Sequence, residues 1–108
     1  MKRGDIVIVA ARGLDTGKPR PALIVQSDLF NPVHPSVTVC LISTDFVDAS
    51  LFRIAVAPGE QTGLQKPSQV MIDKIASLPR EAISSEIGHL DPATRDHVDG
   101  ALRRWFAV

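Results

Sequence analysis

Short runs of apolar and β-branched residues recur along the first three quarters of the chain and predict β-strands. The runs are bounded by clusters of Gly, Pro, Asn and Asp, which are typical of turns between strands. The predicted strands are Ile6–Ala11, Ala22–Gln26, Val37–Ile42, Leu51–Ala57 and Gln69–Ile75. Because no strand–helix–strand rhythm is visible, the pattern favours an antiparallel sheet curled into a barrel or sandwich.

The end of the chain changes to a helical period. Asp91 followed by Pro92 predicts a helix start, because Asp can cap free N–H groups and proline suits the first helical position. Gly100 is expected to let this helix pack closely on the sheet, and residues 78–82 predict a short helical turn. The apolar stripe of the helix is predicted at Thr94, Val98, Ala101, Leu102 and Trp105.

Length and composition indicate a single globular domain over residues 1–108. Apolar residues make up 44% of the chain and charged residues 22%, which is typical of a folded protein. The single cysteine, Cys40, lies in an apolar run and is interpreted as a buried structural thiol in a reducing compartment. The longest apolar run, Ile6–Ala11, is far shorter than the ~20 residues of a membrane span. We therefore expect a cytoplasmic protein with no membrane partner.

The charges balance as a sum but not along the sequence. Twelve basic residues face twelve acidic ones, so an all-over basic nucleic-acid wrapper is excluded. Residues 1–20 hold five basic and two acidic side chains, whereas residues 21–108 hold seven and ten. A short nucleic-acid site requires only such a local cationic surface.

Metal and cofactor motifs are missing from the sequence. The three histidines share no ligand spacing with Cys40, so we expect no metal site. Glycine-rich phosphate loops and the Gly-x-Ser-x-Gly elbow are also absent, and no cofactor is expected.

Polar residues cluster instead where the predicted strands end. Arg20 closes a basic loop, and residues 43–45 (Ser-Thr-Asp) interrupt an apolar strand. An arginine, a hydroxyl and a carboxylate such as Asp73 could together bind a phosphate and stabilise charge in a transition state. Each residue also has a structural interpretation: Arg20 as a surface loop charge, residues 43–45 as a turn, and Asp73 as an ion-pair partner.

Five segments in this order resemble the MazF/PemK family of toxins, the mRNA interferases of type II toxin–antitoxin systems. The segment at residues 17–28 contains the Arg-Pro pair of that family, and the segment at 87–92 contains its Gly-His-Leu-x-Pro pattern. The resemblance spans the whole chain. The matching segments are Lys2–Val7, Gly17–Asp28, Leu41–Thr44, Ser68–Pro79 and Ile87–Pro92.

The resemblance implies a fold, an activity and partners. The fold is an SH3-like antiparallel β-barrel with a C-terminal helix, in a homodimer with the RNA groove at the dimer face. The activity is metal-independent, sequence-specific cleavage of single-stranded RNA, without the ribosome. The ribose 2′-OH attacks the adjacent phosphorus and leaves a 2′,3′-cyclic phosphate and a 5′-OH. A cognate antitoxin, with a disordered tail that folds onto the toxin, would block the RNA groove.

The resemblance also assigns roles to single residues. Arg20 matches the catalytic arginine, Ser43 falls on the catalytic hydroxyl, and Thr44 is one step away as an alternative. Asp73, beside a Lys where many members have Gln, is a candidate acid or base. The candidate RNA-binding residues are Arg12, Lys18, His34, Gln69 and Lys74.

Two other functions compete with the nuclease. The CcdB gyrase poisons resemble this family in fold and act through a tryptophan-containing tip of the last helix. Trp105 and Phe106 near the end of this chain would form such a tip, although Trp105 also continues the apolar stripe of the helix. A third alternative is an SH3-like binding or antitoxin-decoy module that has lost activity.

Overall fold

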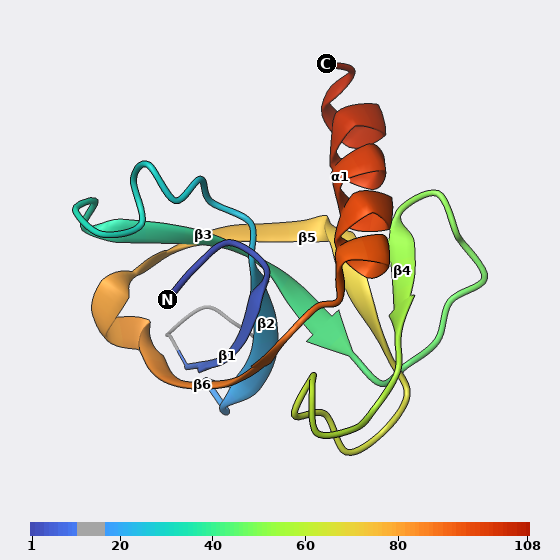
Figure 1. Cartoon of the computed structure of the whole chain (residues 1–108), viewed down its shortest axis with the longest axis horizontal. Coiled ribbons are helices and arrows are strands. Elements are labelled where there is room, and N and C mark those ends of the chain that lie inside the picture. Colours follow the sequence, from blue (N-terminus) through green and yellow to red (C-terminus); the bar gives the residue numbers. More distant parts are fainter. Residues whose placement is uncertain (11–16) are drawn as a thin grey trace.

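In the described part of the chain, residues 1–10 and 17–108 of a computed structural model, six antiparallel strands form one curled sheet and a helix follows them (Figure 1). The order across the sheet is β4-β5-β3-β2-β1-β6. The sheet curls into an open barrel, which confirms the expected antiparallel barrel with a C-terminal helix. The strands are β1 (Asp5–Val9), β2 (Arg20–Ile24), β3 (Ser36–Ser43), β4 (Arg53–Val56), β5 (Ser68–Pro79) and β6 (Ile83–His89).

Each face of the sheet buries its own hydrophobic cluster, because side chains alternate between the faces along every strand. The inner core fills the curl of the sheet, and the helix-side core lies beneath the helix. The inner core consists of Val7, Val9, Ala22, Ile24, Val37, Val39, Leu41, Met71 and Leu78. The helix-side core consists of Ile6, Leu23, Cys40, Ile42, Ile54, Val56, Leu64, Val70, Ile72, Leu90, Val98 and Ala101.

Cys40 lies in the helix-side core, as expected for a structural thiol. Its side chain is fully buried, and this burial raises the pKa of the thiol to about 12. A thiol that stays protonated at neutral pH is a weak nucleophile. Cys40 therefore acts as a small apolar residue.

All five predicted strands are present, with shifted ends, but the sequence prediction missed β6. Only Ile83 and Ile87 of β6 are large and apolar, and both are half-buried. β6 is an edge strand, and its pairing with β1 shifts twice. Edge strands with irregular pairing carry a weak alternation of polar and apolar residues. The short helical turn expected at residues 78–82 is confirmed as η1 (Arg80–Ala82), which joins β5 to β6.

The helix α1 (Pro92–Phe106) begins where the sequence predicted, with Pro92 at its first position. The capping expectation for Asp91 is wrong: Asp91 occupies the N-cap position, but its side chain makes no capping hydrogen bond. Val98 and Ala101 are buried, whereas Trp105 is 48% exposed and contacts the Phe52 ring at 5.8 Å between centroids. The buried stripe therefore ends before the last turn of α1.

Close packing is not the reason for the glycine in α1. A Cβ added at Gly100 would meet only the flexible Arg104 side chain, at 3.6 Å. The expectation that Gly100 lets the helix approach the sheet is therefore wrong. The helix is instead held at two other points. Arg3 donates to the carboxylate of Asp99 at 2.8 Å, and Arg104 donates to the carbonyl of Leu51 at 3.2 Å.

Candidate functional site

Arg20 and Ser43 lie at the same end of the sheet, on neighbouring strands. Arg20 is the first residue of β2 and Ser43 is the last residue of β3. These strands pair with Ala22 opposite Leu41. Because the strands are antiparallel, the residue two before Ala22 and the residue two after Leu41 lie opposite each other, which pairs Arg20 with Ser43. Neighbouring strands are ~4.8 Å apart, so the two predicted residues are brought together.

The two residues also share a face of the sheet. Ala22 and Leu41 both point into the inner core. Residues two positions apart in a strand point to the same side. Arg20 and Ser43 therefore extend the inner-core face to the rim of the barrel. There Arg20 is half-buried and makes an interaction of its own, and Ser43 is half-buried beside it.

The hydroxyl groups of Ser43 and Thr44 have different surroundings. The Ser43 hydroxyl oxygen accepts a hydrogen bond from the Asp45 N–H at 3.0 Å, which fixes the oxygen and leaves its O–H able to donate. Thr44 instead lines a hollow of about 420 Å³ with Pro21 and Ser68. Pro21 and Ser68 alternate with Arg20 and Gln69 in their strands and so face the helix side. The geometry therefore groups Ser43, and not Thr44, with Arg20.

Gln69 lies next to this pair but is occupied by the backbone. It pairs with Ser43 across β3 and β5 and is 6% exposed. Its side-chain amide donates to the carbonyl of Val47 and accepts from the Val47 N–H, both at 3.0 Å. Gln69 thus fastens the loop after β3 to the sheet and holds the segment that follows the Ser43 hydroxyl.

Asp73 is bound to an arginine that the sequence analysis did not single out. The Arg53 guanidinium donates through Nε and Nη2 to both Asp73 carboxylate oxygens, at 2.8 and 2.9 Å. This bonding lowers the pKa of Asp73 below its ordinary value. A carboxylate with both oxygens occupied and a lowered pKa is a weak base. Its neighbour Lys74 is exposed.

Replacing Asp73 with Asn is expected to lower the free energy of unfolding at neutral pH by about 1–3 kcal/mol, because Arg53 would lose a charged partner in a half-buried site. The folded-state pKa of Asp73 is depressed, so its contribution is present above the unfolded pKa and is lost as the pH falls through the folded one. Urea unfolding of the parent and Asp73→Asn should therefore differ at pH 7 and converge as the pH falls through the lowered pKa of Asp73. Asp48→Asn, at an exposed position, is the control. Equal stabilities at pH 7 would contradict the prediction.

The remaining predicted residues are spread over the molecule. His34 lies before β3, at the end opposite Ser43, and its Nδ1 accepts from the Ser36 N–H at 3.0 Å. The length of β3 separates it from Ser43 by roughly 25 Å. Lys18 is exposed two residues before Arg20. Arg12 lies outside the described residues.

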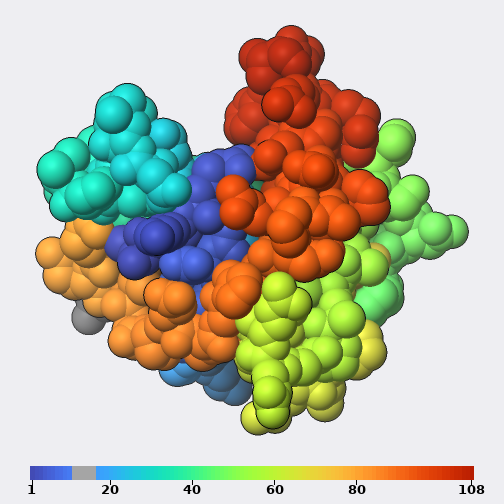
Figure 2. Space-filling model, in the orientation of Figure 1, coloured from blue at the N-terminus to red at the C-terminus, as the bar shows by residue number. Residues whose placement is uncertain are grey.

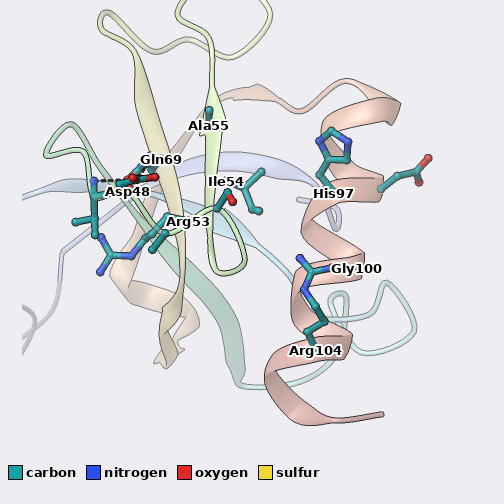
Figure 3. A pocket seen from close by; sticks show the side chains of 12 residues that line it. Asp48, Arg53, Ile54, Ala55, Gln69, His97, Gly100 and Arg104 are labelled. Carbon is teal, nitrogen blue, oxygen red and sulfur yellow. Dashed lines mark hydrogen bonds between the residues drawn. The ribbon is translucent and has the colours of Figure 1, made fainter.

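A second hollow, of about 540 Å³, separates β4 from α1 (Figure 3). Arg53 and Gln69 come from its sheet side, whereas His97 and Arg104 come from the helix, with Gly100 between them. Asp48 and Asp96 also line it, so positive and negative groups are mixed. It borders the edge strand β4, whereas Arg20 and Ser43 lie on β2 and β3.

Within residues 1–10 and 17–108, no three His, Cys, Asp or Glu side chains gather into a possible metal site. In the same residues, no helix has the length and apolar character required to cross a membrane.

Comparison with known proteins identifies the family. Residues 2–106 match the family model described as PemK-like, MazF-like toxin of type II toxin-antitoxin system. The chain belongs to this toxin family. It is 45% identical over 108 residues to the probable endoribonuclease MazF of Mycolicibacterium smegmatis, and the match covers 100% of the chain and 98% of that relative.

More distant relatives of the toxin cover it equally fully. The endoribonuclease EndoA of Bacillus subtilis is 27% identical over 111 residues, covering 100% of the toxin and 96% of EndoA. A mycobacterial endoribonuclease, solved in complex with its cognate antitoxin, superposes with a TM-score of 0.82 at 21% identity, covering 100% of the toxin and 96% of that chain. These findings favour the nuclease branch over the gyrase poisons.

Proposed function

We propose that this toxin is an endoribonuclease that cleaves single-stranded RNA and is neutralised by a cognate antitoxin. The proposal rests on the strand register, in which Arg20 and Ser43 fall opposite one another on one face at one end of the sheet. Family membership and the endoribonuclease relatives support the same activity.

The reaction that fits this pair is attack of a ribose 2′-OH on the adjacent phosphorus. A bond from O2′ to phosphorus forms and the bond from phosphorus to O5′ breaks, which leaves a 2′,3′-cyclic phosphate and a 5′-OH. A water molecule accepts the 2′ proton, and the departing 5′ oxygen takes a proton from a second water molecule. Negative charge develops on the non-bridging oxygens of the phosphorane during this step.

Arg20 and Ser43 stabilise that charge in our scheme. The guanidinium binds phosphate oxygens through two N–H groups and stays charged, so it acts electrostatically and not as a base. The Ser43 O–H donates to a second oxygen, held in place by the Asp45 N–H. Donors already fixed in position before the reaction contribute strongly to such stabilisation. Asp73 has no step here, because Arg53 occupies both its oxygens.

We also propose that the toxin acts in the cytoplasm as a homodimer, and that the face around the end of α1 forms the dimer contact. Exposed apolar side chains lie on α1 and on the 44–52 loop, and Arg104 joins the two segments through its hydrogen bond to the Leu51 carbonyl. Aromatic residues and arginine are enriched at protein interfaces. The large exposed apolar residues of these two segments are Phe46, Val47, Leu51, Trp105 and Phe106.

The purified toxin is expected to cut single-stranded RNA in the presence of EDTA, because the scheme places charge stabilisation on Arg20 and Ser43. Structured RNA should resist, since paired bases cannot be splayed out for reading. Labelling of the new ends by polynucleotide kinase without prior phosphatase treatment would show 5′-OH groups. Intact RNA together with trapped gyrase–DNA complexes would instead support the gyrase-poison alternative at Trp105 and Phe106.

A further inference from the structure

The hollow that contains Thr44 lies on the helix side of the sheet, immediately behind the proposed catalytic pair. We infer that this hollow binds one unpaired base of the RNA, next to the phosphate that is cleaved. The inference rests on the proposed nuclease function and adds a base-reading site to it.

The lining combines apolar surface with hydrogen-bonding groups. Pro21, Leu64 and Ile87 supply flat apolar contact, and the volume of the hollow is about 420 Å³. Thr44, Gln65 and Lys66 add a hydroxyl, an amide and an ammonium group. Single-stranded RNA is recognised by the same combination, because a splayed base packs on its flat face and is read along its polar edges.

The hollow adjoins the proposed catalytic pair along the chain. Pro21 follows Arg20, and Thr44 follows Ser43, so each catalytic residue has a neighbour in the hollow. One residue of a strand spans only ~3.4 Å. A nucleotide whose phosphate lies between Arg20 and Ser43 can therefore pass its base over the strand ends into the hollow. A hollow reached within one residue of the proposed cleavage site favours RNA over a side chain of another protein as the occupant.

Two glycines let the segment that carries Gln65 and Lys66 pack closely against β6. Residues 57–67 cross β6 so closely that a Cβ at Gly63, where φ is +72°, would lie 2.1 Å from the Ile87 carbonyl oxygen. A Cβ at Gly88 would lie 2.3 Å from the carbonyl carbon of Thr62. In Figure 2 the yellow-green atoms of this segment pack directly against the orange atoms of β6.

Hydrogen bonds add to this fixation. The His89 N–H donates to the Gln61 carbonyl at 2.9 Å, and the Thr62 hydroxyl donates to the Ala57 carbonyl at 2.9 Å. A wall fixed in advance loses little entropy when a ligand binds, which is what a recognition site requires. These bonds thus fix the backbone that leads to Gln65 and Lys66.

The test combines a change in the protein with the removal of one base from the RNA, and asks whether the two effects on kcat/KM are independent. A short RNA that the toxin cuts is made in a series, each with one abasic nucleotide beside the cleavage site. At one position, the missing base should lower kcat/KM of the parent by about 10-fold or more. In the double variant Gln65→Leu/Lys66→Met, the intact RNA should already be cut about 10-fold more slowly, and the same abasic change should cost little.

Gln61→Leu provides the matched control, because Gln61 lies on the same segment but outside the hollow. It should keep the full abasic penalty. If every abasic penalty persists in Gln65→Leu/Lys66→Met while the parent still produces 5′-OH ends, the inference is overturned and the nuclease function stands. If Gln65→Leu/Lys66→Met cuts RNA like the parent but is inhibited less by the antitoxin, the inference is overturned in favour of a protein-binding site. A parent that cuts no RNA would refute the proposed function itself.

Discussion

Arg20→Ala is expected to lower the rate of RNA cleavage by about 10³-fold or more while leaving the fold intact. Arg20 is the charged member of the proposed catalytic pair, and an arginine that stabilises charge on a transferring phosphoryl group contributes effects of this size. Single-turnover cleavage of a labelled RNA measures the chemical step directly. Circular dichroism and urea unfolding would show whether the variant still folds.

Two further variants separate charge from geometry. Arg20→Lys keeps the charge but loses the planar fork, so it should regain only part of the rate. Lys18→Ala removes an exposed cation two residues away and should weaken RNA binding, with a smaller loss at saturating RNA. If Arg20→Ala cuts RNA as fast as the parent, the site lies elsewhere.

Ser43→Ala is expected to reduce the cleavage rate by about 10²–10³-fold, the usual loss when one positioned donor to developing charge is removed. The loss should affect every RNA sequence alike, because the Ser43 hydroxyl is proposed to contact a phosphate oxygen and not a base. Single-turnover rates on several RNA sequences would measure it.

Thr44→Val is the comparison that decides which hydroxyl matters. Thr44 faces the hollow on the other side of the sheet, so this variant should retain most of its rate on some sequences and change the order of preference among them. Ser43→Thr keeps a hydroxyl at this position and should therefore cleave RNA much faster than Ser43→Ala. A uniform rate loss in Thr44→Val with an unaffected Ser43→Ala would reverse the assignment.

The sequence predicted the strands that are buried on both faces better than the edge strand β6. In β3, burial on both sides produces a continuous apolar run that is easy to recognise. β6 buries no side chain fully, so its pattern of residues resembles a loop. The start of α1 was predictable because Pro92 fixes its own backbone. The sequence could not show that the Asp91 side chain makes no capping hydrogen bond, because the partner that a side chain takes depends on its tertiary surroundings.

The same distinction applies to the candidate site. Arg20 and Ser43 follow from strand ends that meet, which a pattern of strands can predict. The attachment of Asp73 to Arg53 depends on the pairing of β4 with β5, since Arg53 lies opposite Met71 and so near Asp73. His34 could be placed far from Arg20 only once the order of the strand ends was known. The hollow beside Thr44 was not predictable, because it arises where the 57–67 segment crosses β6.

The alternation of side chains along β2 and β3 has a consequence for how such toxins can diverge. On our assignment, the residues that carry the reaction and the residues that read the base lie on opposite faces of the same two strand ends. Substitutions at Gln65 or Lys66 can then change which transcripts are cut without touching the groups that cut them. A descendant of this toxin could acquire a new set of cellular targets by a few mutations, while Arg20 and Ser43, which carry the reaction, stay the same.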